Sequence, residues 1–422
     1  MSASRLGRWD FFDPVVLSNP YEFYRQLRRE SPVYEVRHPE LGQSMFLVAS
    51  YALVKEVGSR PDLFSSDFAH VLFGGASVNP EADAIIAELP CEPTFLLTHD
   101  DPAHRRRRAI VSGAFTPRIV AELSSSIAET TDSIIDGFIE RGECDFVHDF
   151  AVFLPTFVIA DILGVDRAHY ARVTEWSDAI ILRVGKMATK QQEIDAARQI
   201  VEFREFMLRL IQERRTHRTS DLISNAMYAD PNGEPPLTDE ELLSFVQEVL
   251  VAGNETTRNT LISGMIRFLE NPDQLRLLRE DPSLAINAVD ETLRLETPAS
   301  SMWRIATRET VLGGVRLPKG AIISLRYDSA NRDETQFPDP DKFDIQRSNA
   351  RTHLSFSYGP HHCMGQHLAR KELSVAFPKL LTRLRNVRIM AEKSDLRVKP
   401  SVLIRARNAL NISFDPGPRQ TA

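Results

Sequence analysis

The stretch that decides the fold is Phe356-Ser-Tyr-Gly-Pro-His-His-Cys-Met-Gly-Gln-His-Leu-Ala369. A loop containing Gly359 leads to Cys363, and an apolar spacing typical of an amphipathic helix begins at Met364. Amide N–H groups at a helix start carry partial positive charge, which together with a metal stabilises a thiolate. Gly359 and Gly365 lack a Cβ, so the backbone there can approach a bulky, flat group. The stretch therefore indicates a cysteine that can be held as a metal-binding thiolate.

A single cysteine, taken alone, is more often a small buried apolar residue than a ligand. Here it belongs to a longer pattern, formed by Phe356, Gly359, His361, Cys363, Gly365, Leu368 and Ala369. This pattern closely resembles the haem-ligand loop of the cytochrome P450 family. The resemblance implies haem b as the cofactor, with Cys363 as the proximal ligand of its iron and His361 and Gly365 binding the macrocycle. Thiolate donation then favours O–O cleavage. The family often has glycine where this chain has Ser357, which stiffens the loop without involving the ligand.

The composition indicates one large domain over residues 1–422, with loose termini at 1–19 and 416–422. The clearest break, residues 230–236, is shorter than a flexible tether and is typical of a loop before a helix. A net charge of −7 gives no basic field that favours nucleic acid. The three cysteines are too scattered for a disulfide framework, and neither a signal peptide nor a run of about 18 apolar residues is present. We therefore expect a cytoplasmic protein without a membrane anchor.

Apolar spacing is helical over most of the chain, and short strand patterns occur near residues 33–48, 310–325 and 403–414. These patterns predict a mainly α fold with small β-sheets. The resemblance adds the cytochrome P450 fold, a single domain in which one long central helix crosses over the haem.

A long helix is predicted to begin at Thr238, where the hydroxyl and Glu241 form a capping box, and to end before Pro272. Its middle, Ala252-Gly-Asn-Glu-Thr-Thr, is poor helix material, because glycine alone costs about 1 kcal/mol against alanine. We expect a functional distortion there, although a packing glycine is the simpler explanation for Gly253 alone.

The six residues from Ala252 to Thr257 resemble the family's oxygen-activation motif. The resemblance implies that Thr256 orders water and donates to the oxygen being activated, while Glu255 relays protons from solvent. Acid–base assistance of this kind contributes about 10²- to 10⁴-fold. Ala252 has the small side chain needed where the helix passes close over the macrocycle.

Four consecutive arginines, 105–108, follow His104. In isolation such a run is most often a solvated face and less often a nucleic-acid patch. Pro102 can open a helix there, which places His104 and Arg108 four apart on one face. The pattern Asp-Pro-x-His-x-x-x-Arg is similar to the family's propionate-binding helix, which implies that His104 and Arg108 bind haem propionates. Arg105, Arg106 and Arg107 would then partly face an acidic redox partner.

Glu291 and Arg294 are three apart, and an exposed pair at this spacing contributes only about 0.3 kcal/mol. The surrounding residues 290–298 resemble the family's Glu-x-x-Arg helix, in which the pair is buried and structural. A third basic partner is then expected from the turn-rich segment before the cysteine loop. Lys342 and Arg347 both suit this role, and the sequence leaves the choice between them open.

The resemblance also places Arg304 on a propionate, as it does His361, and residues 299–302 on the pocket wall. The irregular segment 61–93 is either satellite core or a lid over an apolar ligand. An apolar substrate is indicated by the candidate pocket residues Phe68, Phe73, Val249, Ala299, Met302 and Leu410. Steroids, terpenoids, fatty acids and other lipid-like compounds all suit such a lining.

Three signatures in the family's order predict a haem-thiolate monooxygenase that hydroxylates its substrate. With no flavin or iron–sulfur segment, the electrons are expected from a separate ferredoxin and its reductase, with contacts at Arg106, Arg107, Arg351, Arg370 and Lys371. A peroxygenase would usually lack the pair of Glu255 and Thr256, and a non-catalytic haem sensor would not need it. A zinc site made of Cys91, Cys144, His361 and Cys363 has no recognised ligand spacing. The protein is expected to be a monomer.

Overall fold

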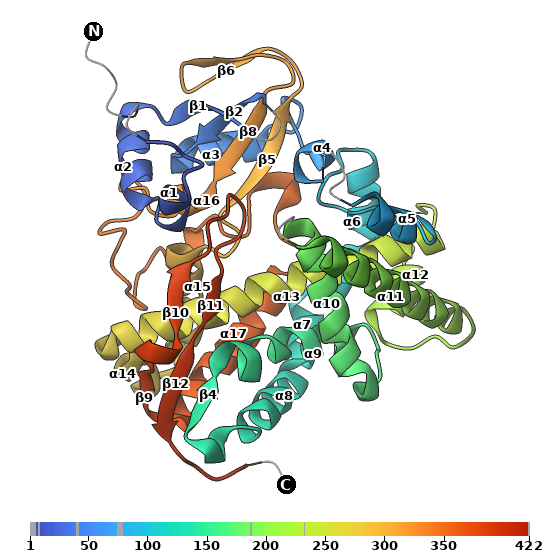
Figure 1. Ribbon diagram of the computed structural model, residues 1–422. Helices are drawn as coiled ribbons and strands as arrows, with labels where there is room; N and C mark the ends of the chain where they lie inside the picture. Colours follow the sequence, from blue (N-terminus) through green and yellow to red (C-terminus); the bar gives the residue numbers. More distant parts are fainter. Residues whose placement is uncertain are drawn as a thin grey trace. The chain divides into compact units, whose positions relative to one another are not determined.

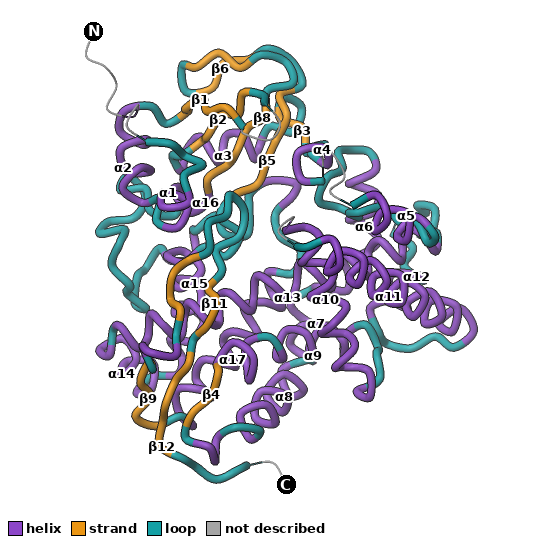
Figure 2. Tube along the Cα trace, in the orientation of Figure 1, coloured by secondary structure: helices purple, strands orange, loops and turns teal. Residues whose placement is uncertain are grey.

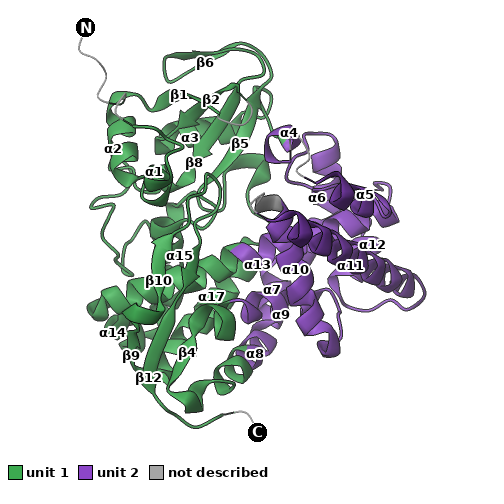
Figure 3. Ribbon diagram, viewed as in Figure 1, with its two compact units in different colours: residues 1–68, 131–151, 256–422 green, residues 69–130, 152–255 purple. Residues whose placement is uncertain are grey.

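The computed structural model describes residues 6, 9–38, 42–73, 79–185, 188–231 and 233–420. Most of these residues are helical, and the strands form small sheets (Figures 1 and 2). The chain divides into two compact units (Figure 3). Unit 1 comprises residues 1–68, 131–151 and 256–422, and unit 2 comprises residues 69–130 and 152–255. The single domain expected from the sequence stays a prediction.

Unit 1 contains all the strands found in the described residues. Its helices are α1 (Pro14–Ser18), α2 (Tyr21–Glu30), α3 (Tyr51–Ser59), α14 (Pro272–Glu280), α15 (Ala285–Glu296), α16 (Tyr327–Ala330) and α17 (Gln366–Arg383). Its strands are β1 (Val33–Arg37), β2 (Ser44–Val48), β3 (Phe64–Ser65), β4 (Glu143–Asp145), β5 (Ser301–Ala306), β6 (Thr310–Leu312), β7 (Val315–Leu317), β8 (Ile322–Arg326), β9 (Arg385–Ile389), β10 (Asp395–Val398), β11 (Arg407–Ala409) and β12 (Asn411–Asp415).

The largest sheet of unit 1 has five strands in the order β1-β2-β8-β5-β3, and Figure 2 labels all five. The hairpin predicted at residues 33–48 is confirmed, since β1 and β2 pair antiparallel with Val33 opposite Val48. Strand β8 joins β2 in parallel and β5 antiparallel. Val54 of α3 and Leu325 of β8 belong to one buried cluster with Val48, so burial of apolar surface holds α3 against this sheet.

The described parts of both terminal segments contact the rest of unit 1. In the N-terminal segment, Phe11 is 2% exposed, because its ring packs against that of Phe23 at 6.1 Å between centroids. Helix α1 follows from Pro14. Near the other end, the amides of Gly417 and Gln420 donate to Ile139 O and to the carboxylate of Asp136. The expectation of loose termini stays a prediction.

The described residues of unit 2 form helices joined by loops and contain no strand. Its helices are α4 (Ala69–Leu72), α5 (Pro80–Ala87), α6 (Ala103–Ser112), α7 (Pro117–Glu122), α9 (Phe153–Ile162), α10 (Tyr170–Gly185), α11 (Lys190–Thr216) and α12 (Leu222–Met227). A capping box of Thr189 and Gln192 starts α11, and the ring of Trp176 on α10 lies 5.8 Å from that of Phe203 on α11. Helices α10 and α11 therefore share an apolar core.

Two helices belong to both units. Helix α8 (Ser124–Asp136) begins in unit 2 and ends in unit 1, and so does α13 (Asp239–Glu270). The capping box predicted for α13 is confirmed, since Thr238 N donates to Glu241 Oε2 and Glu241 N donates to Thr238 Oγ1, both at 3.1 Å. Helix α13 is therefore one continuous element that carries candidate residues of each unit.

Candidate functional site

The loop before α17 contains Cys363, which is exposed between half-buried neighbours. Its amide donates to Phe356 O at 2.8 Å, which closes the loop between these two residues. Gly359 adopts a φ of +82°, and a Cβ there would collide with the carbonyl of Gly58 on α3. Contact with α3, together with the left-handed backbone, therefore explains this glycine. Helix α17 itself begins at Gln366, two residues after the predicted start.

Ser357, the position where the family often has glycine, has a φ of +63°. A residue with a Cβ is strained by roughly 1–2 kcal/mol in this left-handed region. Its hydroxyl lies 2.9 Å from the Tyr327 hydroxyl, a hydrogen bond that offsets part of the strain. Tyr327 is fully buried, and burial raises the pKa of its phenol, so it stays a neutral donor or acceptor. This pair was not predicted, since the two residues lie 30 apart in the sequence.

The other candidate residues of unit 1 lie on β5 and nearby loops. Arg304 is 3% exposed on β5, where Nη1 donates to Trp303 O at 2.7 Å, and His361 is half-buried in the turn before Cys363. Ala299 forms a bridge with Ile404. The remaining candidates range from buried to half-buried: Phe68, Met302 and Leu410. The ring of Phe68 lies 6.0 Å from that of Trp303, so in unit 1 it packs as a core residue beside β5.

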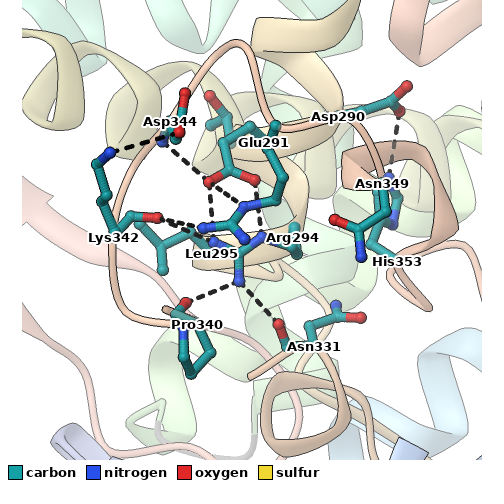
Figure 4. A network of polar contacts seen from close by, with 12 residues as sticks. Asp290, Glu291, Arg294, Leu295, Asn331, Pro340, Lys342, Asp344, Asn349 and His353 are labelled. Atoms are coloured by element: carbon teal, nitrogen blue, oxygen red, sulfur yellow. Dashed lines mark hydrogen bonds and ion pairs between the residues drawn. The ribbon is translucent and has the colours of Figure 1, made fainter. Parts of the chain in front are cut away.

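Glu291 and Arg294 on α15 form a fully buried ion pair (Figure 4). Arg294 donates to both Glu291 oxygens at 2.7 and 2.9 Å and to three backbone carbonyls at 2.8–3.1 Å. Arg347 completes the network, because its Nε donates to Glu291 Oε1 at 3.1 Å. The Lys342 side chain is 63% exposed and pairs with Asp344, so only its carbonyl takes part. The structure thereby decides between the two candidates for the third partner.

A second network adjoins the first through Asp290 (Figure 4). His353 Nε2 lies 3.2 Å from Asp290 Oδ1, and Arg370 Nε donates to the same oxygen at 2.7 Å. Because Ser355 N donates to His353 Nδ1, that nitrogen holds a lone pair and the imidazole is neutral. Burial lowers the pKa of His353, which agrees with the neutral form. Arg370 is therefore committed to Asp290, and the expectation that it is available to a ferredoxin is wrong.

In unit 2, α6 buries His104 at 3% exposure and leaves Arg108 half-buried. Burial lowers the pKa of His104, and the nearby Arg108 acts in the same direction. Arg107 is buried and donates to both oxygens of Glu92 at 2.7 and 3.0 Å. Arg106 is paired with Glu241. The prediction that Arg107 faces a redox partner is therefore wrong, because this side chain is buried within unit 2. Arg106 is half-buried and ion-paired, and Arg105 is exposed.

The middle of α13 remains helical through Ala252-Gly-Asn-Glu-Thr-Thr, so the expected distortion does not interrupt it. A Cβ at Gly253 would lie 2.7 Å from Ile159 Cδ1, which makes this a packing glycine. Asn254 Nδ2 donates to Ser177 Oγ at 2.7 Å. Tertiary contacts thus override weak helix propensity. Taken one by one, Ala252 is exposed, Glu255 is 8% exposed and Thr256 is half-buried.

Glu248 lies one turn before Ala252 and was not singled out in the sequence. Its carboxylate accepts hydrogen bonds from the backbone amides of Phe95, Leu96 and Leu97 at 2.7–3.3 Å. Burial raises the pKa of Glu248, although the three amides act in the opposite direction. Of the apolar candidates in unit 2, Val249 is 9% exposed and Phe73 is 37% exposed. An acidic residue in an apolar run is the signal that could have identified Glu248.

Comparison with known proteins decides the family. The cytochrome P450 family model matches residues 174–409. A steroid C26-monooxygenase of Mycobacterium tuberculosis is 34% identical over 395 residues, which cover 94% of each chain. This chain belongs to the cytochrome P450 family. The 6-deoxyerythronolide B hydroxylase of Saccharopolyspora erythraea is 34% identical over 397 residues, covering 94% of this P450 and 96% of that enzyme.

A solved structure, that of cytochrome P450 CYP109Q5 from Chondromyces apiculatus, matches this P450 with a TM-score of 0.85 and 32% identity, over 97% and 98% of the two chains. The predicted fold class, family and enzyme class are therefore confirmed. This P450 is a monooxygenase of a family whose cofactor is a thiolate-ligated haem. In the described residues, no group of three or more His, Cys, Asp or Glu side chains is placed to hold a metal ion. Among the described helices, none combines the length and apolarity that a membrane crossing needs.

Proposed function

We propose that this P450 binds haem b through the Cys363 thiolate and hydroxylates an apolar small molecule. The balanced reaction converts substrate-H, O₂, two electrons and two protons into substrate-OH and water. The observation that carries the proposal is the exposed Cys363 in the pattern from Phe356 to Ala369. Of the three cysteines, Cys144 is buried and Cys91 is half-buried, so Cys363 is the cysteine whose thiolate is most accessible to a metal ion from outside the chain.

The remaining donor set suits the charges of the group. Haem carries two propionates, and the proposed partners for these carboxylates are His104, Arg108, Arg304 and His361. A buried guanidinium such as that of Arg304 favours an anionic partner. Ala252 and Gly365 have the small side chains that a flat macrocycle needs beside it. When bound, the haem supplies the chemistry that activates O₂.

Thr256 and Glu255 are proposed to deliver protons during the reaction. The Thr256 hydroxyl can hold a water and donate a hydrogen bond, and the carboxyl of Glu255 can pass on protons taken from solvent. A Thr256→Ala variant should keep its substrate affinity but release peroxide in place of hydroxylated product. The measurement is the ratio of peroxide formed to NADH consumed, and unchanged coupling would contradict this role.

The substrate is proposed to be a steroid, terpenoid, fatty acid or similar lipid-like compound. Support comes from the relatives, which are named as a steroid C26-monooxygenase and a 6-deoxyerythronolide B hydroxylase. The proposed lining consists of Phe68, Phe73, Val249, Ala299, Met302 and Leu410. Electrons are proposed to come from a ferredoxin and its reductase. Arg351, exposed before the cysteine loop, and Lys371, half-buried on α17, remain candidate contacts. A cytoplasmic location and a monomeric state stay predictions.

The decisive experiment is the absorption spectrum of the reduced protein under carbon monoxide. The wild type should show the red-shifted Soret maximum of thiolate-ligated haem, and Cys363→Ala should lose it. Cys91→Ala is the matched control and should keep the maximum, because Cys91 is half-buried in unit 2. A wild type without this maximum would overturn the proposal. Product formation with NADH and a ferredoxin system then separates a monooxygenase from a non-catalytic sensor, and activity with peroxide alone would indicate a peroxygenase.

A further inference from the structure

Three consecutive amides converge on one carboxylate in unit 2. Glu248 Oε2 accepts from Phe95 N at 2.7 Å, from Leu96 N at 3.2 Å and from Leu97 N at 3.3 Å, and Oε1 also accepts from Leu96 N. A carboxylate has about four lone-pair positions, and this one uses three or more on a single backbone stretch. Hydrogen bonds to a charged acceptor are stronger than those between neutral groups. Glu248 therefore fixes the backbone of residues 95–97.

Arg107 also contacts this backbone stretch. Arg107 Nη1 donates to Phe95 O at 3.1 Å, and its guanidinium carbon lies 5.3 Å from the centre of the Phe95 ring. Within the stretch, the hydroxyls of Thr94 and Thr98 are 2.6 Å apart. A short loop with donors, acceptors and a ring all engaged has little freedom left, so residues 94–98 form one rigid turn.

One face of helix α13 contacts this turn and the residues around it. Glu241 pairs with Arg107, Ser244 Oγ donates to Glu92 O at 3.0 Å, and Phe245 lies 5.2 Å from Phe95 between ring centroids. Together with Glu248 these residues have the spacing i, i+3, i+4 and i+7, which is one helix face. The next residue on that face is Ala252, about 6 Å further along the axis at 1.5 Å per residue.

The turn therefore ends where the proposed catalytic stretch of α13 begins. Leu96 is 7% exposed and Leu97 is half-buried, so apolar side chains project from a backbone that the Glu248 carboxylate holds. We propose that Glu248 is a positioning residue: it fixes residues 95–97 as an apolar wall beside the Ala252 turn and thereby sets which C–H bond of the substrate is presented. This inference rests on the proposed function.

The test compares Glu248→Gln with Glu240→Gln in the haem-loaded enzyme. Glu240 lies on the same helix, is exposed, and undergoes the same chemical change, so it controls for loss of charge on α13. A glutamine at 248 keeps the shape but removes the charge, and one of its two terminal positions becomes an N–H₂ group that cannot accept from Leu96 N. We expect hydrogen exchange at the amides of residues 95–97 to accelerate at least tenfold in Glu248→Gln and to stay unchanged in Glu240→Gln.

A functional readout accompanies the exchange measurement. With a compound that shifts the Soret band of the wild type, Glu248→Gln should raise the dissociation constant several-fold and change the ratio of product isomers. Glu248→Asp keeps the charge and should restore both in part, which also covers the case in which Glu248→Gln folds poorly. Unchanged exchange at residues 95–97 would show that the Glu248 carboxylate does not fix this backbone and would overturn the proposal. Faster exchange with unchanged affinity and isomer ratio would show that this backbone does not set how the substrate is presented and would overturn it as well. A failure of the proposed function is seen separately, as a missing thiolate spectrum in the wild type.

Discussion

Arg347 should matter far more to stability than Lys342, although both were candidates for the same role. Arg347 is 8% exposed in its side chain and binds Glu291, which is fully buried. Replacing Arg347 with alanine removes one charged hydrogen bond of about 1.5–3 kcal/mol. Three backbone carbonyls also lose a hydrogen bond from Arg347, but these bonds lie at the surface, where water can replace the donor. We expect Arg347→Ala to lower the free energy of unfolding by about 2–3 kcal/mol.

Lys342→Ala is the matched control. Its side chain is 63% exposed and its ammonium lies 3.5 Å from the Asp344 carboxylate, so the pair contributes at most about 0.5 kcal/mol. The carbonyl of residue 342, which accepts from Arg294 and Arg347, is present in the alanine variant as well. Glu291→Gln defines the upper limit. It leaves the buried Arg294 without its counter-ion, at a cost of about 3–5 kcal/mol.

The assay is urea denaturation of the haem-loaded variants, followed by circular dichroism. The expected order of destabilisation is Glu291→Gln, then Arg347→Ala, then Lys342→Ala. If Lys342→Ala lowers the free energy of unfolding as much as Arg347→Ala does, the lysine side chain is the third partner and the assignment of Arg347 fails. If Glu291→Gln is neutral, the buried ion pair does not stabilise this fold, and the reasoning from burial is refuted.

Three further predictions concern other parts of unit 1. Burial lowers the pKa of His353 below its usual value, so the stability that this side chain contributes should be present above about pH 6.5 and be lost as the pH falls below that. The free energy of unfolding in urea should therefore decline less toward pH 5 in His353→Gln than in the wild type, by up to about 1.4 kcal/mol per pH unit. Gly264→Ala should lower the melting temperature despite its better helix propensity, because the new Cβ would meet the ring of Phe377, and adding Phe377→Leu should recover most of the loss. Tyr327→Phe should lower the free energy of unfolding by about 1 kcal/mol in the wild type and leave it unchanged in a Ser357→Gly background, because glycine already lacks the hydroxyl partner and relieves the left-handed strain. An equal loss in both backgrounds would exclude the hydrogen bond.

Local patterns predicted the elements that neighbouring residues define. The capping box at Thr238, the apolar period that follows it and the hairpin at residues 33–48 are short-range features, and each appears in the structure. The pattern around Cys363 predicted the family in the same way. The strand β5, in contrast, was not predicted, because its place between β8 and β3 depends on strands that are distant in the sequence.

Tertiary structure decided which member of each similar set is buried. In the arginine run of α6, Arg105 is exposed while Arg107 is buried, because Glu92 and Glu241 lie beside one position of the helix and not the other. The choice of Arg347 over Lys342 has the same origin, since Arg347 contacts Glu291 across 56 residues of sequence.

The amino-acid sequence by itself determined the family, the thiolate candidate and the course of the long helix, since periodicity, capping and motif spacing act over a few residues. The hydrogen bond from the Phe95 amide to Glu248 joins residues 153 apart, and the hydrogen bond between Tyr327 and Ser357 joins residues 30 apart. Only the folded chain selects such partners, because a carboxylate or hydroxyl binds whichever group packing brings within about 3 Å of it.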